Sequence, residues 1–296
     1  MRIVYFGTPD FAVEPLKKLV ENGHEVCAVV TREDKPKGRG YELQPTPVKE
    51  EALRHNITVL HPVKLKDENF LEQLQSYDAD VFVVVAYGRI LPGQLLEIPK
   101  KGCINVHASL LPSYRGAAPI QWAVIDGLTE TGVTTMLMDE GLDTGDILKQ
   151  YRITLDDEET GDSLFDKLAV LGGEAIIDTL NELSAGTIVP VKQGETDTDY
   201  ARMLTKADGN IDFTKTAVEI ERMVRGLNPW PSAYTYFNGK TLKIWKARVS
   251  EICDNDNPLC FKTGDGYLYA TEVQLEGKKR MDADTFLLGY KNKEKK

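Results

Sequence analysis

The run VFVVVAY, at residues 81–87 of this 296-residue chain, narrows the choice of fold more than any other segment. It is continuously apolar and rich in valine, without the polar-apolar alternation of a strand that has one face in water. Strands of this kind are buried on both faces, as in a parallel sheet covered by helices. The run is also far shorter than the ~18 apolar residues of a membrane span. The sequence therefore predicts a buried parallel sheet built around this strand.

Strand and helix signals alternate through the first 180 residues. Short β-rich runs occur at residues 2–6, 25–31, 103–109 and 132–139, and helical patterns lie between or after them, as at 68–77 and 162–183. This βαβ rhythm is typical of a doubly wound α/β domain with a mainly parallel sheet. We expect residues 1–188 to form that domain.

The character of the sequence changes after this domain. Residues 189–206 are polar and lack long periodic runs, so we expect a linker there and a second domain at 207–296. A helical pattern at 216–227 is followed by Pro-Trp-Pro, which forbids its continuation. Asn238-Gly239 lies between two aromatic, β-branched runs, which is a strong hairpin signal. The second domain is therefore predicted to be a small β-barrel.

Charge is unevenly distributed along the chain. The formal net charge of −10 argues against a general nucleic-acid binder. Residues 201–296, however, carry 17 Lys and Arg against 13 Asp and Glu, whereas residues 1–200 carry 19 against 33. Such asymmetry can mark a polyanion-binding module attached to an acidic body, or only a solvated surface. Charge alone leaves both interpretations open.

Cysteine usage and the N-terminus indicate a cytoplasmic protein. The four cysteines, at positions 27, 103, 253 and 260, form no CxxC pair, and we interpret them as reduced thiols. The N-terminus, MRIVYFGTPDF, has one basic residue and too short an apolar run for a secretory signal. Trp230 and Trp245 are expected in the core of the second domain.

An amide and an imidazole stand two residues apart, at Asn105 and His107, near the end of a predicted strand. Because side chains of a strand alternate with a period of two, both should lie on one face. Ligands of parallel sheets bind beyond the carboxyl ends of the strands. The loop EGLDTGD follows the next predicted strand, and its Asp143 could reach the histidine. An imidazole held by a carboxylate can act as a general base, and an asparagine can donate to an oxyanion. The alternative is a buried structural histidine beside a turn-forming asparagine.

Other kinds of site lack their sequence patterns. The four histidines are scattered without metal-ligand spacing, so we expect no metal site. The first βα turn, FGTPDF, lacks the GxGxxG of a dinucleotide site, and Ser109 has no GxSxG elbow.

Several motifs together carry a family resemblance. In chain order they are GTPDFAV, KPKGRG with PTPVK, VVVAYGRILP, GCINVHASLLPSYRGAAPIQWA, TGVT, MDEGLDTGD, NPWP and LEGKKRM. This set resembles the methionyl-tRNA formyltransferases and covers nearly the whole chain. The resemblance implies an N-terminal formyltransferase domain that binds folate and a C-terminal OB-like β-barrel that binds tRNA, trimmed here near residues 250–265.

The resemblance also implies an activity and a site. The activity is transfer of the formyl group of 10-formyltetrahydrofolate to the α-amine of initiator methionyl-tRNA, with Asn105, His107 and Asp143 as the catalytic set. Folate contacts are expected at Arg89, Ile90, Leu91, Ser109, Leu110, Leu111, Pro112, Asp139, Gly141 and Leu142. Contacts to tRNA are expected at Lys35, Lys37 and Arg39 in the loop 31–49, and at Lys243, Lys246, Lys278, Lys279 and Arg280. The loop departs from the family where it reads YELQ, since relatives commonly carry lysines there.

Three alternative functions share part of this evidence. A sugar or small-amine N-formyltransferase would use the same catalytic set, but it needs neither the GRG loop nor a basic C-terminal segment. A formyltetrahydrofolate hydrolase would replace the amine with water. An RNA-binding protein with a vestigial α/β domain would not need an intact Asn-His-Asp set. We therefore expect a cytoplasmic, monomeric enzyme that modifies initiator tRNA.

Overall fold

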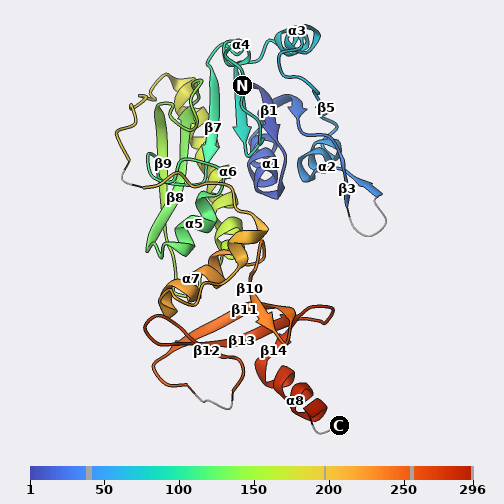
Figure 1. Ribbon diagram of the computed structural model, residues 1–296. Helices are drawn as coiled ribbons and strands as arrows, with labels where there is room; N and C mark the ends of the chain where they lie inside the picture. Colours follow the sequence, from blue (N-terminus) through green and yellow to red (C-terminus); the bar gives the residue numbers. More distant parts are fainter. Residues whose placement is uncertain (38–41, 197, 254–256, 295–296) are drawn as a thin grey trace. The chain divides into compact units, whose positions relative to one another are not determined.

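A computed structural model describes residues 1–37, 42–196, 198–253 and 257–294 (Figure 1). The chain forms two compact units whose segments interleave along the sequence. The first unit comprises Met1–Gly116, Glu130–Ile153 and Phe165–Tyr200, and the second comprises Ala117–Thr129, Thr154–Leu164 and the chain from Ala201 onward. None of the helices in the described ranges is both long and apolar enough to cross a membrane.

A seven-stranded sheet forms the centre of the first unit, in the order β5-β2-β1-β6-β7-β8-β9 (Figure 1). Its strands are β1 (Arg2–Gly7), β2 (Glu25–Val30), β5 (Thr58–Leu60), β6 (Val81–Val85), β7 (Cys103–His107), β8 (Glu130–Leu137) and β9 (Ile147–Thr154). The pairs β5-β2, β2-β1, β1-β6 and β6-β7 are parallel, and β7-β8 is antiparallel. The predicted α/β class with a mainly parallel sheet is therefore confirmed. The apolar run at residues 81–87 contains β6, which is buried along its full length.

Helices accompany the strands as the alternating pattern predicted. They are η1 (Asp10–Ala12), α1 (Val13–Glu21), α2 (Pro47–Arg54), α3 (Glu68–Ser76), α4 (Gly93–Leu96) and α6 (Gly161–Ala185). Helices α2 and α3 each begin at an N-cap side chain that accepts a backbone N–H: Thr46 accepts from Lys49 N, and Asp67 accepts from Phe70 N. Between β2 and α2 lies a short antiparallel pair, β3 (Lys35–Lys37) with β4 (Glu42–Gln44).

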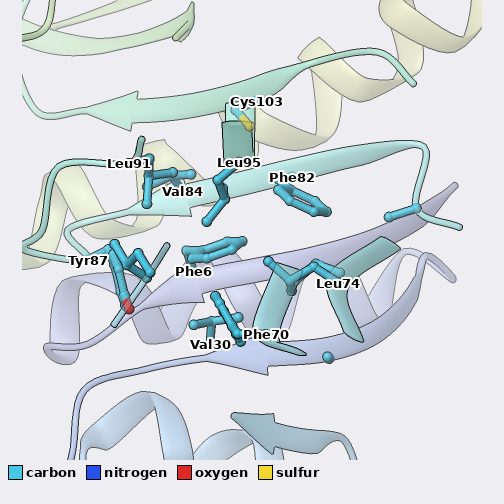
Figure 2. Packing of buried hydrophobic residues seen from close by; sticks show 14 residues of the cluster. Phe6, Val30, Phe70, Leu74, Phe82, Val84, Tyr87, Leu91, Leu95 and Cys103 are labelled. Atoms are coloured by element: carbon cyan, nitrogen blue, oxygen red, sulfur yellow. The ribbon is translucent and has the colours of Figure 1, made fainter. Parts of the chain in front are cut away.

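One face of the sheet carries an apolar cluster covered by α3 and α4 (Figure 2). Phe6, Val30, Phe82 and Val84 come from three neighbouring strands, and Phe70, Leu74 and Leu95 come from the two helices. Cys103 closes the cluster at the start of β7, and burial raises the pKa of its thiol to about 12. Because β7 alternates its side chains, the face that holds Cys103 also holds Asn105 and His107. The candidate site residues Asn105 and His107 therefore follow the apolar cluster along the same face of β7.

The opposite face packs against α6. A Cβ added to Gly172 would lie 3.1 Å from Val106 Cγ1, so the helix backbone runs close behind β7. Thr179 of α6 donates to the carbonyl of Ala175, 2.7 Å away, and its oxygen is 2.7 Å from Thr135 Oγ1 of β8. All of these side chains are buried, so the strand that bears the candidate site rests on a rigid layer.

The second unit contains an antiparallel sheet with the order β10-β11-β13-β12, and β14 pairs with β13. Its elements are α5 (Pro119–Ile125), η2 (Lys206–Gly209), α7 (Ala217–Gly226), β10 (Ala233–Phe237), β11 (Lys240–Ser250), β12 (Cys260–Lys262), β13 (Tyr267–Leu275), β14 (Met281–Asp282) and α8 (Ala283–Glu294). The predicted hairpin is confirmed: β10 and β11 flank Asn238 and Gly239, both with positive φ. A capping box between Thr216 and Glu219 starts α7.

Two expectations about this unit are wrong. Cys253 and Cys260 form a disulfide, with their Cα atoms 6.2 Å apart, so they are not free thiols. A spacing of seven residues in the sequence does not reveal this pairing. Trp230 is 54% exposed instead of forming part of the core, because it lies in the proline-flanked turn before β10.

Candidate active site

Strand β7 places Asn105 and His107 on one face, as predicted. Asn105 pairs in register with Val84 of β6 and Met136 of β8, while His107 pairs with Thr134. The histidine is 7% exposed and the asparagine is half-buried. Among the described residues, none exchanges a hydrogen bond with the side-chain amide of Asn105. A half-buried amide without a protein partner is available to a ligand.

The hydrogen bond of His107 fixes which nitrogen carries its proton. Its Nε2 lies 3.0 Å from the carbonyl oxygen of Tyr114. Because a carbonyl only accepts, Nε2 carries the hydrogen, and Nδ1 of the neutral ring has a free lone pair. This Nδ1 faces Asp143, whose Oδ1 is 3.8 Å away. That separation is too long for a direct hydrogen bond but short enough for the carboxylate to stabilise an imidazolium.

Asp143 reaches the histidine by a route that differs from the expected one. Since β8 runs antiparallel to β7, it ends beside the start of β7, where Met138 N donates to the carbonyl of Cys103. The segment after β8 turns back along β7 and brings Asp143 to His107. There Asp143 Oδ2 accepts a 2.9 Å hydrogen bond from Gly116 N. The residue adopts φ of 55°, a left-handed conformation that aspartate tolerates better than most residues.

The acid-bearing loop, residues 138–145, is closed at its base and shaped from within. Leu137 N donates to the carbonyl of Asp146 across 2.8 Å. A Cβ on Gly145 would lie 1.8 Å from Leu137 O, so only glycine fits at that point. Inside the loop, Asp139 Oδ1 accepts from Gly141 N at 2.9 Å and from Thr144 Oγ1 at 2.8 Å. Leu142 is 51% exposed at its tip. Three predicted folate residues, Asp139, Gly141 and Leu142, thus lie in the same loop as the acid.

The turn after β7 contains the other predicted folate residues Ser109, Leu110, Leu111 and Pro112. Its shape depends on Thr134, whose Oγ1 donates to the carbonyl of Ser109 at 2.7 Å and accepts from Leu111 N at 3.0 Å. Gln150 Nε2 donates to the carbonyl of Leu111 at 2.7 Å. The peptide bond between Leu111 and Pro112 is cis.

Arg89, Ile90 and Leu91 follow β6 and differ in where their side chains lie. The Arg89 guanidinium donates to the carbonyls of Pro62 and Val63 at 2.8 and 3.0 Å. Ile90 is 68% exposed, whereas Leu91 belongs to the core cluster of Figure 2. The side chains of Arg89 and Leu91 are therefore engaged with the protein, which leaves backbone groups for a ligand.

The residues expected to contact tRNA fall into two groups. Lys35 and Lys37 lie on β3, and Arg39 lies outside the described residues. The second group lies on and around the antiparallel sheet: Lys243 and Lys246 on β11, and the exposed Lys278, Lys279 and Arg280 after β13.

A half-buried tryptophan underlies part of the second group. Lys243 Nζ and the Arg280 guanidinium lie 5.4 and 4.7 Å from the centroid of the Trp245 ring, so Trp245 supports cations at the surface. Arg280 also forms a two-point ion pair with Glu272.

The structure adds functional residues that the sequence did not point to. Tyr114 holds His107, and Thr134 and Gln150 shape the turn. Gln193 donates to the carbonyl of Asp143 and is itself held by Arg115. The Arg-Gly that follows Tyr114 was a visible signal, but a lone glutamine in a polar stretch was not. Within the described ranges, no group of three or more His, Cys, Asp or Glu is arranged to hold a metal ion.

Comparison with known proteins assigns the chain to a family. Residues 1–180 match the family described as formyl transferase, and residues 203–291 match the formyl transferase C-terminal domain. A methionyl-tRNA formyltransferase of Lachnospira eligens is 55% identical, over 98% of this chain and 96% of that protein. One from Agathobacter rectalis is 52% identical, with 98% and 96% covered.

A solved structure shows the same fold. The crystal structure of an N-formyltransferase from Helicobacter canadensis, in complex with folinic acid and dTDP-3-aminofucose, superposes with a TM-score of 0.67 at 19% identity. The match covers 94% of this chain and 99% of that one. Fold and family matches thus define an enzyme that transfers formyl groups. At the identity shared with the two bacterial relatives over its full length, the chain belongs to the methionyl-tRNA formyltransferase family. The expected fold class and enzyme class are confirmed.

Proposed function

We propose that the protein transfers the formyl group of 10-formyltetrahydrofolate to the α-amine of methionyl initiator tRNA. The observation that carries the proposal is the meeting of Asn105, His107 and Asp143 in a chain more than half identical to an enzyme named for this reaction. Residues 1–188 would bind folate and perform the chemistry, and residues 207–296 would bind tRNA. Because initiator tRNA is consumed at cytoplasmic ribosomes, we assign the enzyme to the cytoplasm, and we propose that it acts as a monomer.

Asn105 and His107 would handle the charge and the proton of the reaction. When the amine attacks the formyl carbon, negative charge develops on the formyl oxygen, and the uncommitted amide of Asn105 can donate to it. The attacking nitrogen must lose a proton. Because Nε2 of His107 already donates to Tyr114 O, the proton is accepted at Nδ1. Asp143 then faces the imidazolium that forms, 3.8 Å away. The same proton is returned to N10 of the folate as the C–N bond breaks.

The pocket for folate would use the three segments described above. The backbone after β6 at Arg89, Ile90 and Leu91, the turn at Ser109, Leu110, Leu111 and Pro112, and the loop at Asp139, Gly141 and Leu142 supply hydrogen-bonding groups and apolar contacts. For tRNA we propose Lys35, Lys37 and Arg39, with Lys243, Lys246, Lys278, Lys279 and Arg280 facing phosphates.

A direct assay tests the proposal. Purified protein is mixed with 10-formyltetrahydrofolate and methionyl initiator tRNA, and N-formylmethionyl-tRNA is measured. Parallel reactions contain a sugar amine or no acceptor. Formylation of tRNA alone is expected. Transfer to the sugar amine without transfer to tRNA would indicate a small-amine formyltransferase, and formate release without an acceptor would indicate a hydrolase.

A further inference from the structure

Gln193 follows helix α6 in the chain and belongs to the first unit. It lies in a segment without regular secondary structure, yet its side chain is hydrogen-bonded to the candidate active site. The segment is attached to β9 by two backbone hydrogen bonds of 2.8 Å between Ile147 and Val191. Two residues later the side chain of Gln193 turns toward the acid-bearing loop. Its amide nitrogen donates to the carbonyl of Asp143 at 2.9 Å and to the carbonyl of Gly145 at 2.7 Å.

The other end of the same amide is bound equally well. Gln193 Oε1 accepts from Arg115 Nε at 2.9 Å and from Arg115 Nη2 at 2.7 Å. An amide has two protons to donate and two lone pairs to accept with, so all of its capacity is used. The orientation of the amide is also unambiguous, because only its nitrogen can donate to carbonyls and only its oxygen can accept from a guanidinium.

The partners of Gln193 are connected to both His107 and Asp143. The three consecutive residues Tyr114, Arg115 and Gly116 bind His107, Gln193 and Asp143 respectively. Gln193 therefore connects the carbonyls of the acid-bearing loop to the backbone segment that fixes the histidine. Asp143 has a left-handed backbone, and a residue in that conformation persists where its surroundings hold it.

We propose that Gln193, anchored by Arg115, is a positioning residue that sets the place of the Asp143 carboxylate relative to His107. The inference rests on the proposed function and adds to it a residue from outside the catalytic set. Without the two donated hydrogen bonds, the carbonyls of Asp143 and Gly145 lose the donor that holds this part of the loop in place. A misplacement of about 1 Å can cost on the order of 10²-fold in rate.

Three variants separate positioning from general structural support. Gln193→Ala removes the four hydrogen bonds described above and the longer contact of 3.9 Å from Nε2 to Met136 Sδ. Gln193→Glu keeps an acceptor for Arg115 but places an oxygen against the carbonyls of Asp143 and Gly145. The matched control is Asn22→Ala, because the Asn22 amide also donates to a backbone carbonyl, that of Lys18 at 2.8 Å, and takes no part in the site.

We expect both Gln193 variants to lower kcat by about 10- to 100-fold, with the KM for tRNA within about twofold of wild type and a melting temperature close to that of Asn22→Ala. In an Asp143→Asn background, Gln193→Ala should lower kcat no further. Gln193→Glu with wild-type kcat, or an equal fold-loss in both backgrounds, would overturn the inference.

Hydrogen exchange supplies a measurement that does not need the reaction. Amides of residues 143–145 should exchange faster in Gln193→Ala than in wild type, and unchanged exchange would also overturn the inference. If Gln193→Ala exchanges faster than wild type at these amides but the wild-type protein formylates no tRNA, the proposed function fails and the positioning contact stands.

Discussion

His107 and Asn105 differ in how much of their hydrogen-bonding capacity the protein itself uses. One ring nitrogen of His107 is bound to the carbonyl of Tyr114, so the ring is oriented before any substrate arrives. The amide of Asn105 has no such bond within the described residues. Orientation of one group and availability of the other are what a site needs in order to stabilise charge that appears only during the reaction.

Replacement of Asn105 by alanine should therefore lower kcat by about 10²–10³-fold, which is the usual effect of losing one oxyanion donor. The side chain is half-buried, whereas Ile104 and Val106 on either side of it are buried, so the melting temperature should change little. Steady-state kinetics with methionyl-tRNA measure the first effect and thermal unfolding the second. Near-wild-type turnover would contradict the assigned role.

Sequence reasoning reached some of these residues and not others for a physical reason. Asn105 and His107 share a strand, so a period of two was enough to bring them together. Asp143 was reached because acidic loops at strand ends are conspicuous. Gln193 lies about 50 residues further along, and its role depends on hydrogen bonds to backbone carbonyls, which leave no mark on its neighbours in the sequence.

At the scale of elements, strand existence was predictable and strand direction was not. The run at 81–87 and the hairpin at Asn238-Gly239 depend on local chemistry and appear where predicted. The antiparallel course of β8 depends on how the chain crosses the sheet, which hydrophobic pattern does not encode. The Cys253–Cys260 disulfide is likewise a product of the fold around it.

The contact between β8 and α6 gives a prediction about stability. Because the hydroxyl of Thr179 donates its hydrogen bond to the carbonyl of Ala175, Thr135 must be the donor between the two hydroxyls. Thr135→Val preserves shape and removes this buried hydrogen bond, so unfolding free energy should fall by about 0.5–1.5 kcal/mol. Urea denaturation measures it. Thr179→Val should lower the unfolding free energy less in the Thr135→Val variant than in the wild type. Strictly additive effects of the two substitutions would argue against the hydrogen bond.

The pair of strands β13 and β14 gives a prediction about pH. Hydrogen bonding from Arg280 lowers the pKa of Glu272 below its ordinary value of 4.5. A depressed pKa means that the pair stabilises the folded protein above that value and ceases to do so as pH falls through the folded pKa. Glu272→Gln should thus lower the melting temperature at pH 7, and the difference from wild type should shrink as the pH falls below 4.5. A difference in melting temperature that is equal at pH 7 and at acidic pH would exclude the ion pair as its source.

For the molecule as a whole, the uneven distribution of charge along the chain predicts how its affinity for a polyanion depends on salt. Residues 201–296 are net positive and the preceding 200 net negative, so attraction to tRNA must come from a limited set of cations. Affinity for tRNA should fall as salt rises, with a log-log slope set by the number of phosphates neutralised. Lys243→Ala should reduce that slope, while Lys17→Ala, whose partner is Glu14, should not. Binding measured at several salt concentrations tests both, and salt-indifferent binding would refute the assignment.

The acid-bearing loop leaves and rejoins the sheet through one narrow base, where Leu137 N meets the carbonyl of Asp146 and Gly145 touches Leu137. Because the loop leaves and rejoins the sheet at one point, residues 138–145 form a self-contained insertion between β8 and β9. It could be transplanted whole from a homologue without altering the register of the strands on either side.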